Sequence, residues 1–395
     1  MNRNLTIQGV CVLIVALCLT ATSALSVELT AEAGRAQLVY TDQAQEGDPP
    51  EVALGIAMGA FRGLFVNYLW IRATKLKEEG KFHEAIELSS AITRLQPRFP
   101  RVWAFHAWNM AYNISVATQT VEERWQWVKA GLDLLRKEAI PRNPNDVLLH
   151  KELAWIFNHK IQGFADDANR YYKRRMAREW SNILGRPPAL PEDAEKSSQI
   201  MADWLQPIVE APDRLEDLIS RDLEANRKSL RTDEEKAAVT SDIPELVEKI
   251  QKEAGLKLDA DLLRFVDIHD SYKGSWYADS KLIQLTDSTR NSKLDALLED
   301  KKYAEEWPKL LAFVRRHVLV NDFNMEPERM QRYTKKFGPL DWRHASSHSI
   351  YWSARGVEEQ LQRIGDHNFD TLNTDRLIVQ SIQELFRAAP TCSSN

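Results

Sequence analysis

Two histidines, His344 and His348, stand four residues apart, which is a spacing found in metal sites. Residues four apart share one face of a helix, and two imidazoles placed in this way can bind one metal ion. Ala345 stands where an HExxH zinc site has its glutamate, and no third ligand lies nearby in the sequence. A packing or capping role at the start of a helix is therefore the better prediction. A metal- or haem-binding protein that uses His344 and His348 is the alternative hypothesis.

A second polar group lies in the aromatic stretch 94–113. His106, Asn109 and Asn113 are separated by three and four residues, so a helix would carry them on one face. Amides on a concave face can bind the backbone of a peptide, and we predict that these three residues line a groove for a partner. The alternative is a solvated or internally bonded stripe beside a core of aromatic rings. The whole predicted groove has six members: Trp103, His106, Asn109, Asn113, His150 and Trp155.

The usual catalytic motifs are absent from the sequence. It has no glycine-rich phosphate loop, no GxSxG turn and no cysteine near a catalytic histidine. Residues 170–180 mix basic and aromatic side chains, as single-stranded nucleic-acid sites do, but Asp166, Asp167 and Glu179 flank them. We therefore predict a binding protein without catalytic residues or cofactors, and one that does not bind nucleic acid.

The elements that must position these residues repeat with a period of 34. Leu69 and Trp103, Ala73 and Ala107, and Leu76 and Met110 are each 34 residues apart. Ala154 follows Ala107 by 47, and Pro144 follows Pro97 by 47, which equals one period plus 13. An insertion around residues 115–124 accounts for both offsets. Two antiparallel helices in a unit of this length cannot bury their apolar face until a neighbour stacks on them.

Residues 66–185 resemble the tetratricopeptide repeat. In the first unit Ala73 and Ala85 are the small contact residues, Gly80 lies in the turn and Pro97 ends the unit. The segments FRGLFVNYLWIRA and GPLDWRHASSHSIYW are also similar to little-characterised bacterial envelope proteins with such repeats. The resemblance implies an all-α fold, an α-solenoid of helical hairpins with a helical insertion, and a protein partner. The low glycine content of 15 residues also favours helix.

The N-terminus has the pattern of an export signal. Arg3 precedes an apolar run at 9–19 and the small residues of ATSA at 21–24. We predict cleavage after Ala24, with a retained membrane anchor as the alternative. A second apolar segment at 52–71 contains Arg62, which favours docking of a helix over a membrane span. If both segments were in the membrane, the protein would be a subunit of an integral assembly.

The sequence thus predicts an exported scaffold of a bacterial envelope, periplasmic or membrane-anchored facing the periplasm, that binds protein partners. Without its signal the chain keeps only Cys392, so no internal disulfide is expected. Residues 192–261 are acidic and helical in pattern. The predicted regions are a signal or anchor at 1–25, a linker at 26–50, repeats at 51–185, an acidic helical insertion at 186–322, further repeat-like helices at 323–390 and a tail at 391–395.

Overall fold

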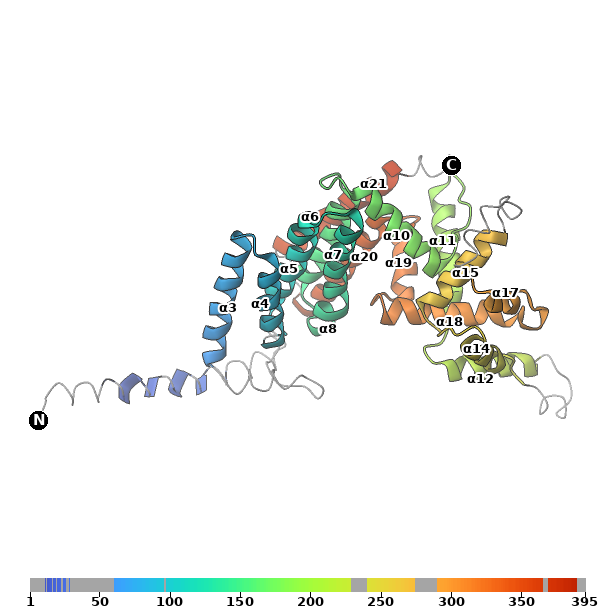
Figure 1. Ribbon diagram of the computed structural model, residues 1–395, viewed down its shortest axis with the longest axis horizontal. Helices are drawn as coiled ribbons and strands as arrows, with labels where there is room; N and C mark the ends of the chain where they lie inside the picture. The colour runs from blue at the N-terminus through green and yellow to red at the C-terminus, as the bar shows by residue number, and fades with distance from the viewer. Residues whose placement is uncertain are drawn as a thin grey trace, which may run out of the picture. The chain divides into compact units, whose positions relative to one another are not determined.

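A computed structural model describes residues 60–95, 97–228, 240–273, 290–364 and 369–388, together with scattered positions between 11 and 28 (Figure 1). Throughout these ranges the regular structure is helical and contains no strand, so the all-α prediction is confirmed. The chain forms two compact units. Unit 1 comprises residues 1–160 and 352–380, and unit 2 comprises residues 161–351 and 381–395.

Unit 1 is built from a few long rods, several of which change from α-helical to π-helical along their length. One rod joins α5, η1 and α6 without a break, and the next joins α7, η2 and α8. The segments are α3 (Ala60–Glu78), α4 (Phe82–Leu95), α5 (Pro100–Trp108), η1 (Asn109–Ile114), α6 (Ser115–Ala117), α7 (Val121–Asp133), η2 (Leu134–Ala139), α8 (Ile140–Arg142), α9 (Val147–Trp155) and the start of η3 (Ile156–Gln162), with parts of α20 (Ala345–Ile364) and α21 (Phe369–Ala388).

The rods of unit 1 pack in chain order, because small residues let their backbones approach. α3 packs against α4, α4 against α5, and α5 against both α7 and α9 (Figure 1). Ala73, Ala85 and Ala107 are fully buried. A Cβ on Gly131 of α7 would lie 2.8 Å from the carbonyl oxygen of Ala107, so only glycine fits there. These close approaches fix the spacing between neighbouring helices.

Local sequence signals set where the rods begin and end. Gly80, with a φ of +75°, turns the chain between α3 and α4. Thr120 and Glu123 form a reciprocal capping box at the start of α7. The Asp146 side chain accepts a hydrogen bond from the Leu149 backbone N–H at the start of α9. The sequence therefore specifies these hairpins locally.

Unit 2 is organised around α18, whose Leu310, Val314 and Val318 form one fully buried stripe. α18 contacts α10, α11, α12, α15 and α19, and α11 runs along α19. The helices of this unit are α10 (Asn169–Leu184), α11 (Ala194–Glu210), α12 (Leu215–Lys228), α14 (Ile243–Lys252), α15 (Ala260–Lys273), α17 (Ser292–Glu299), η6 (Lys301–Tyr303), α18 (Glu306–Asn321) and α19 (Pro327–Phe337), with the remaining parts of η3, α20 and α21.

The predicted regions and the compact units divide the chain at different points. The proline-rich residues 185–193, where the predicted repeats give way to the predicted insertion, do separate α10 from α11, but both helices belong to unit 2. Residues 352–380, far along the chain, return to unit 1. Most of the predicted linker at 26–50 and the tail at 391–395 lie outside the described residues. So does most of 231–242, the stretch whose composition predicts the least order.

The apolar segment at 52–71 is described from residue 60 onward, as the start of α3. Val66 and Leu69 are buried in a cluster with Ile92 of α4 and Val102 of α5. α3 therefore docks its apolar face on its neighbours. Among the helices that the structure describes, none combines the length and the apolar composition needed to cross a membrane.

Candidate functional site

A line of ring-bearing side chains crosses three rods of unit 1. The Trp70 and Phe105 ring centroids are 4.8 Å apart, those of Trp108 and Tyr112 are 5.1 Å apart, and those of Tyr112 and His159 are 5.8 Å apart. The line ends where Trp155 stacks on His159 at 4.7 Å. We call this set the aromatic row: Trp70, Phe105, Trp108, Tyr112, Trp155 and His159.

Helical spacing produces the row. Phe105, Trp108 and Tyr112 are three and four residues apart, and Trp155 and His159 are four apart, so each set shares one face of its rod. The contacts of α5 with α9 then bring these faces side by side. None of the six side chains is fully buried, and Trp155 is 37% exposed. The row is therefore partly exposed, and its most exposed ring is Trp155.

Two lysines place positive charge over the rings. The Lys77 ammonium lies 4.5 Å from the Trp108 ring centroid and 5.5 Å from that of Phe105, so it bridges the gap between them. The Lys160 ammonium lies 5.2 Å from the Tyr112 ring centroid. Such cation–π contacts orient the lysine stems along the rings. Lys160 is buried and Lys77 is half-buried, so of these two lysines only Lys77 can place positive charge at the surface.

Tyr112 and His159 are both neutral at pH 7. Burial raises the pKa of the Tyr112 phenol well above its ordinary value, and the Glu152 carboxylate raises it further. Burial lowers the pKa of His159, and the charge of Lys160 lowers it further. The Tyr112 hydroxyl oxygen lies 3.3 Å from His159 Nδ1, within hydrogen-bonding distance. The row thus offers apolar ring surface with a few neutral polar atoms, which suits binding more than catalysis.

The residues of α5 and η1 that were predicted to line a groove lie on the helix face next to the aromatic row. Their positions correct that prediction. Trp103, His106 and Asn109 are buried, and Asn113 is half-buried. The Asn109 side-chain amide donates to the Phe82 carbonyl oxygen at 3.4 Å, and the Asn113 amide donates to Asn109 Oδ1 at 2.6 Å. These polar groups are used inside unit 1, so they do not line an open groove.

His106 is the least satisfied of these side chains. It is 3% exposed, and neither ring nitrogen has a hydrogen-bond partner among the described residues. Burial lowers its pKa to about 4, so the imidazole is neutral at pH 7. His106 therefore acts as a packing residue next to the row.

His150, also expected in the groove, is fully buried and connects α9 to α20 within unit 1. Its Nδ1 lies 2.9 Å from the Asp146 carbonyl oxygen, and its Nε2 lies 3.4 Å from a carboxylate oxygen of Glu359. The Arg355 Nε donates to the other carboxylate oxygen of Glu359 at 2.8 Å. Trp155 is thus the one predicted groove residue that also belongs to the row.

His344 and His348 lie at the start of α20, in unit 2. His348 is fully buried, and its Nε2 lies 2.7 Å from the Trp342 carbonyl oxygen. The Ser346 backbone N–H donates to Nδ1 of His344 at 3.3 Å. In the part of the chain that the structure describes, no three His, Cys, Asp or Glu side chains lie close enough to hold a metal ion. The geometry around both histidines is that of helix capping and packing.

No protein-family model matches this sequence, and neither the curated proteins nor the solved structures give a match. Function is therefore inferred from the geometry and the sequence of this chain.

The sequence reasoning missed most of the row by one residue. Positions 105, 108 and 112 have the same spacing as positions 106, 109 and 113. The polar set was placed outside and the aromatic set inside, following the usual preference of large rings for the core. In the structure His106 and Asn109 are buried, and Phe105, Trp108 and Tyr112 are half-buried. The sequence did contain a signal, because two neighbouring sets of residues have the same helical spacing. Two such faces cannot both be fully buried, so one of them had to be partly exposed.

Proposed function

We propose that this chain is a helical-repeat scaffold of a bacterial envelope that binds a segment of a partner protein along the aromatic row. The observation that supports it is the line of six partly exposed rings across α3, α5–η1 and α9–η3. The rings contact one another in two groups, and Lys77 bridges the groups. Partly exposed tryptophan and tyrosine side chains are the commonest binding hot spots, because each buries a large area at low entropic cost. Isolated exposed rings need no explanation, but a connected line of them indicates an interaction surface.

The occupant that fits best is an amphipathic helix of a partner protein. An apolar helix face presents side chains at intervals of three and four residues, which can pack between successive rings. Lys77, over Phe105 and Trp108, would pair with a carboxylate at the edge of that helix. We therefore propose a partner segment with aliphatic residues on one face and acidic residues along its border.

A tetratricopeptide-like stack is the architecture that we propose for unit 1. The positions related by the 34-residue period support it, since Leu69 and Trp103 are both buried, as are Ala73 and Ala107. The contacts of α5 with α4, α7 and α9 also agree with hairpins stacked in series. In such a stack the first helices of successive hairpins share one surface, and the aromatic row lies on α3, α5 and α9.

The proposed location in the envelope rests on the N-terminal sequence. The apolar run at 9–19 and the small residues at 21–24 have the pattern of a secretory signal. An exported scaffold would present the row to periplasmic partners.

Site-directed photocrosslinking in the native envelope tests the proposed function. Benzoylphenylalanine would replace Trp108 or Trp155, because it keeps an aromatic ring in the row. The matched control carries it at Gln126, an exposed position on α7. We expect the two row positions to give the same partner adduct, with a crosslinked peptide of the predicted amphipathic type, and the control to give none. Equal adducts from position 126, or no adduct from either row position, would rule the proposal out.

A further inference from the structure

A single phenylalanine projects from the loop between η3 and α10 in unit 2. The Phe164 side chain is 84% exposed, the largest exposed fraction among the large apolar side chains that the structure describes. The Lys173 ammonium of α10 lies 4.8 Å from the centroid of its ring. Phe164 therefore stands at the surface beside a positive charge.

The carboxylate of Asp166 holds this loop in place. The Ala168 backbone N–H donates to Asp166 Oδ1 at 2.8 Å, and the Tyr172 hydroxyl donates to Oδ2 at 3.1 Å. Asp166 is buried, so its carboxylate is not available to pair with a basic side chain at the surface. The loop presents the ring of Phe164 from a fixed base.

The first half of α10 places basic side chains beside this ring. Arg170, Arg174 and Arg175 are exposed, and Lys173 is half-buried. Positions 170 and 174 are four apart, so they share one face of the helix, and Arg174 Nε donates to the Arg170 carbonyl oxygen at 3.3 Å. We call Phe164 and these four residues the basic patch.

Carboxylates do not balance the charges of the basic patch. In the part of the chain that the structure describes, none of its four basic side chains forms an ion pair. Asp167 and Glu179, the other acidic residues that flank it in the sequence, each interact with a different residue of the chain. The patch therefore presents positive charge to the solvent.

Lys173 shows that the like charges of the patch are close together. Burial lowers the pKa of Lys173, the carboxylate of Glu384 opposes that shift, and the charge of Arg170 adds to it. Glu384 also pairs with Arg387, whose nitrogen lies 2.9 Å from its carboxylate. An anion bound between Arg170 and Lys173 would relieve the repulsion between them.

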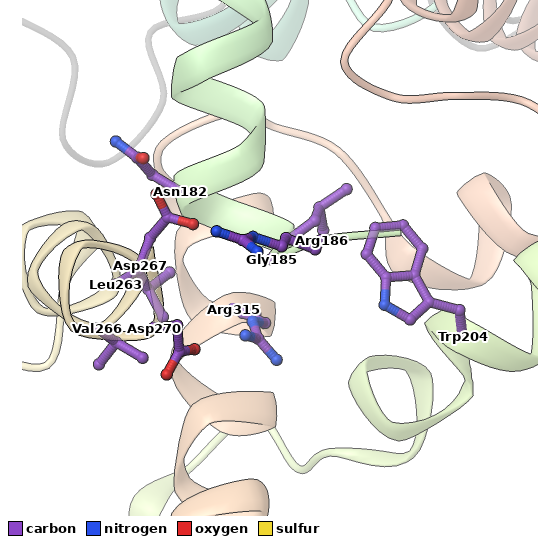
Figure 2. A pocket seen from close by; sticks show the side chains of 10 residues that line it. Asn182, Gly185, Arg186, Trp204, Leu263, Val266, Asp267, Asp270 and Arg315 are labelled. Atoms are coloured by element: carbon purple, nitrogen blue, oxygen red, sulfur yellow. The ribbon is translucent and has the colours of Figure 1, made fainter. Parts of the chain in front are cut away.

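The C-terminal end of α10 is different, because acidic residues face its arginines. Arg186, which follows α10, lines a cavity together with Arg315 of α18 and with Asp267 and Asp270 of α15 (Figure 2). Burial raises the pKa of Asp267, and the charges of Arg186 and Arg178 oppose that shift. Positive and negative groups thus meet at this end, and the unbalanced charge of α10 lies in its first half.

We propose that the basic patch docks on a membrane surface that contains anionic phospholipids. Arg170, Lys173 and Arg174 would bind the lipid phosphates, for which a guanidinium group is a bidentate donor. The ring of Phe164 would enter the boundary between the headgroups and the acyl chains. This surface lies in unit 2 and goes beyond the proposed function of the aromatic row.

A membrane suits the patch better than other polyanions do. Single-stranded nucleic acid stacks successive bases on several rings, and between residues 161 and 184 Phe164 is the one exposed ring. A protein partner covers several apolar side chains, and in the same range no other large apolar side chain is exposed. Membrane binding needs only an apolar anchor together with a basic cluster.

Co-sedimentation of the purified full chain with vesicles tests the proposal. Vesicles of equal parts phosphatidylglycerol and phosphatidylcholine are compared with vesicles of phosphatidylcholine alone. The double variant Arg170→Gln, Arg174→Gln should bind the anionic vesicles roughly 25-fold more weakly, since each charge near such a surface contributes about fivefold. Phe164→Ala should weaken binding about tenfold, because the apolar anchor is lost.

The matched control removes two charges elsewhere in unit 2. Lys228→Gln, Lys301→Gln alters exposed lysines of α12 and η6, so this double variant should bind like the unmodified chain. Circular dichroism checks that every variant is folded. Equal binding of the two double variants, unchanged binding of Phe164→Ala, or equal binding to the two kinds of vesicle would overturn the proposal.

Photocrosslinking gives a readout at the patch itself, which the apolar run at 9–19 does not produce. Benzoylphenylalanine in place of Phe164 should form a phospholipid adduct on illumination with the anionic vesicles. The control carries it in place of Ala225, an exposed residue of α12, and should form none. Absence of the adduct at position 164, or tighter binding of single-stranded RNA than of the vesicles, would also overturn the proposal. These outcomes are independent of the aromatic row in unit 1.

Discussion

Gly356 of α20 lies directly against His150 of α9: a Cβ built on Gly356 would be 2.6 Å from His150 Cβ and 3.0 Å from His150 Cγ. Side-chain carbons do not approach so closely, so only glycine permits this crossing. The contact joins positions 206 residues apart within unit 1 (356 minus 150). The neighbouring contact of His150 Nε2 with a carboxylate oxygen of Glu359, at 3.4 Å, belongs to the same junction.

Gly356→Ala should therefore destabilise unit 1. The added methyl group meets a fully buried imidazole, and overpacking of this kind costs about 1–3 kcal/mol. Urea unfolding followed by circular dichroism measures the loss. Leu372→Ala, at a half-exposed position on α21, is the control and should have little effect. A midpoint for Gly356→Ala equal to that of the unmodified chain would contradict the close approach.

Glu359→Gln should reduce the sensitivity of the chain to acid. Burial raises the pKa of Glu359, but the hydrogen bond from His150 and the charges of Arg355 and His150 outweigh it and lower the pKa from 4.5 to about 2. A carboxyl group with a depressed folded-state pKa stabilises the fold above the unfolded value and loses that contribution as the pH falls through the folded value. The free energy of unfolding should thus fall between pH 4.5 and 2, less steeply in Glu359→Gln. Parallel curves of unfolding free energy against pH for the two proteins would argue against the contacts of Glu359 with Arg355 and His150.

His106→Leu should improve stability under mildly acidic conditions. The folded-state pKa of His106 is about 4 against an ordinary value of 6.5, so below pH 6.5 the unfolded chain binds the proton more readily. The contribution of the neutral His106 imidazole to the free energy of unfolding is therefore complete above pH 6.5 and is lost as the pH falls toward 4. At pH 5 the penalty is about 2 kcal/mol, which leucine would not incur. Thermal melts at pH 7 and pH 5 check this, and the result would count against us if the variant gained nothing at pH 5.

Substitutions at Asn109 of η1 and at Trp155 of α9 should separate stability from binding. Asn109→Ala removes two internal hydrogen bonds, one with Phe82 and one with Asn113, so it should lower the melting temperature. Trp155→Ala removes an exposed ring and should leave the melting temperature nearly unchanged while reducing the partner adduct obtained from position 108. If Asn109→Ala reduced the adduct and Trp155→Ala lowered the melting temperature, the partner would instead bind at the face of His106, Asn109 and Asn113.

Sequence periodicity was sufficient to predict the helical class and the buried small residues Ala73 and Ala107, because both follow from local helix geometry. It could not tell which of two neighbouring faces is buried. His106 and Phe105 belong to equally regular stripes, and only contacts with α4 and α9 decide between them. The return of residues 352–380 to unit 1 has no local signal, because it depends on the fit of Gly356 against His150 across 206 positions.

That long-range fit has a consequence for biosynthesis. α9 leaves the ribosome well before the part of α20 that covers it, and at roughly 5–20 residues per second the delay is about 10–40 s. During that interval the surface of α9 around His150 stays uncovered in the nascent chain. Completion of unit 1 is thus a late event in translation, and a chaperone that shields this surface would act while unit 2 is being made.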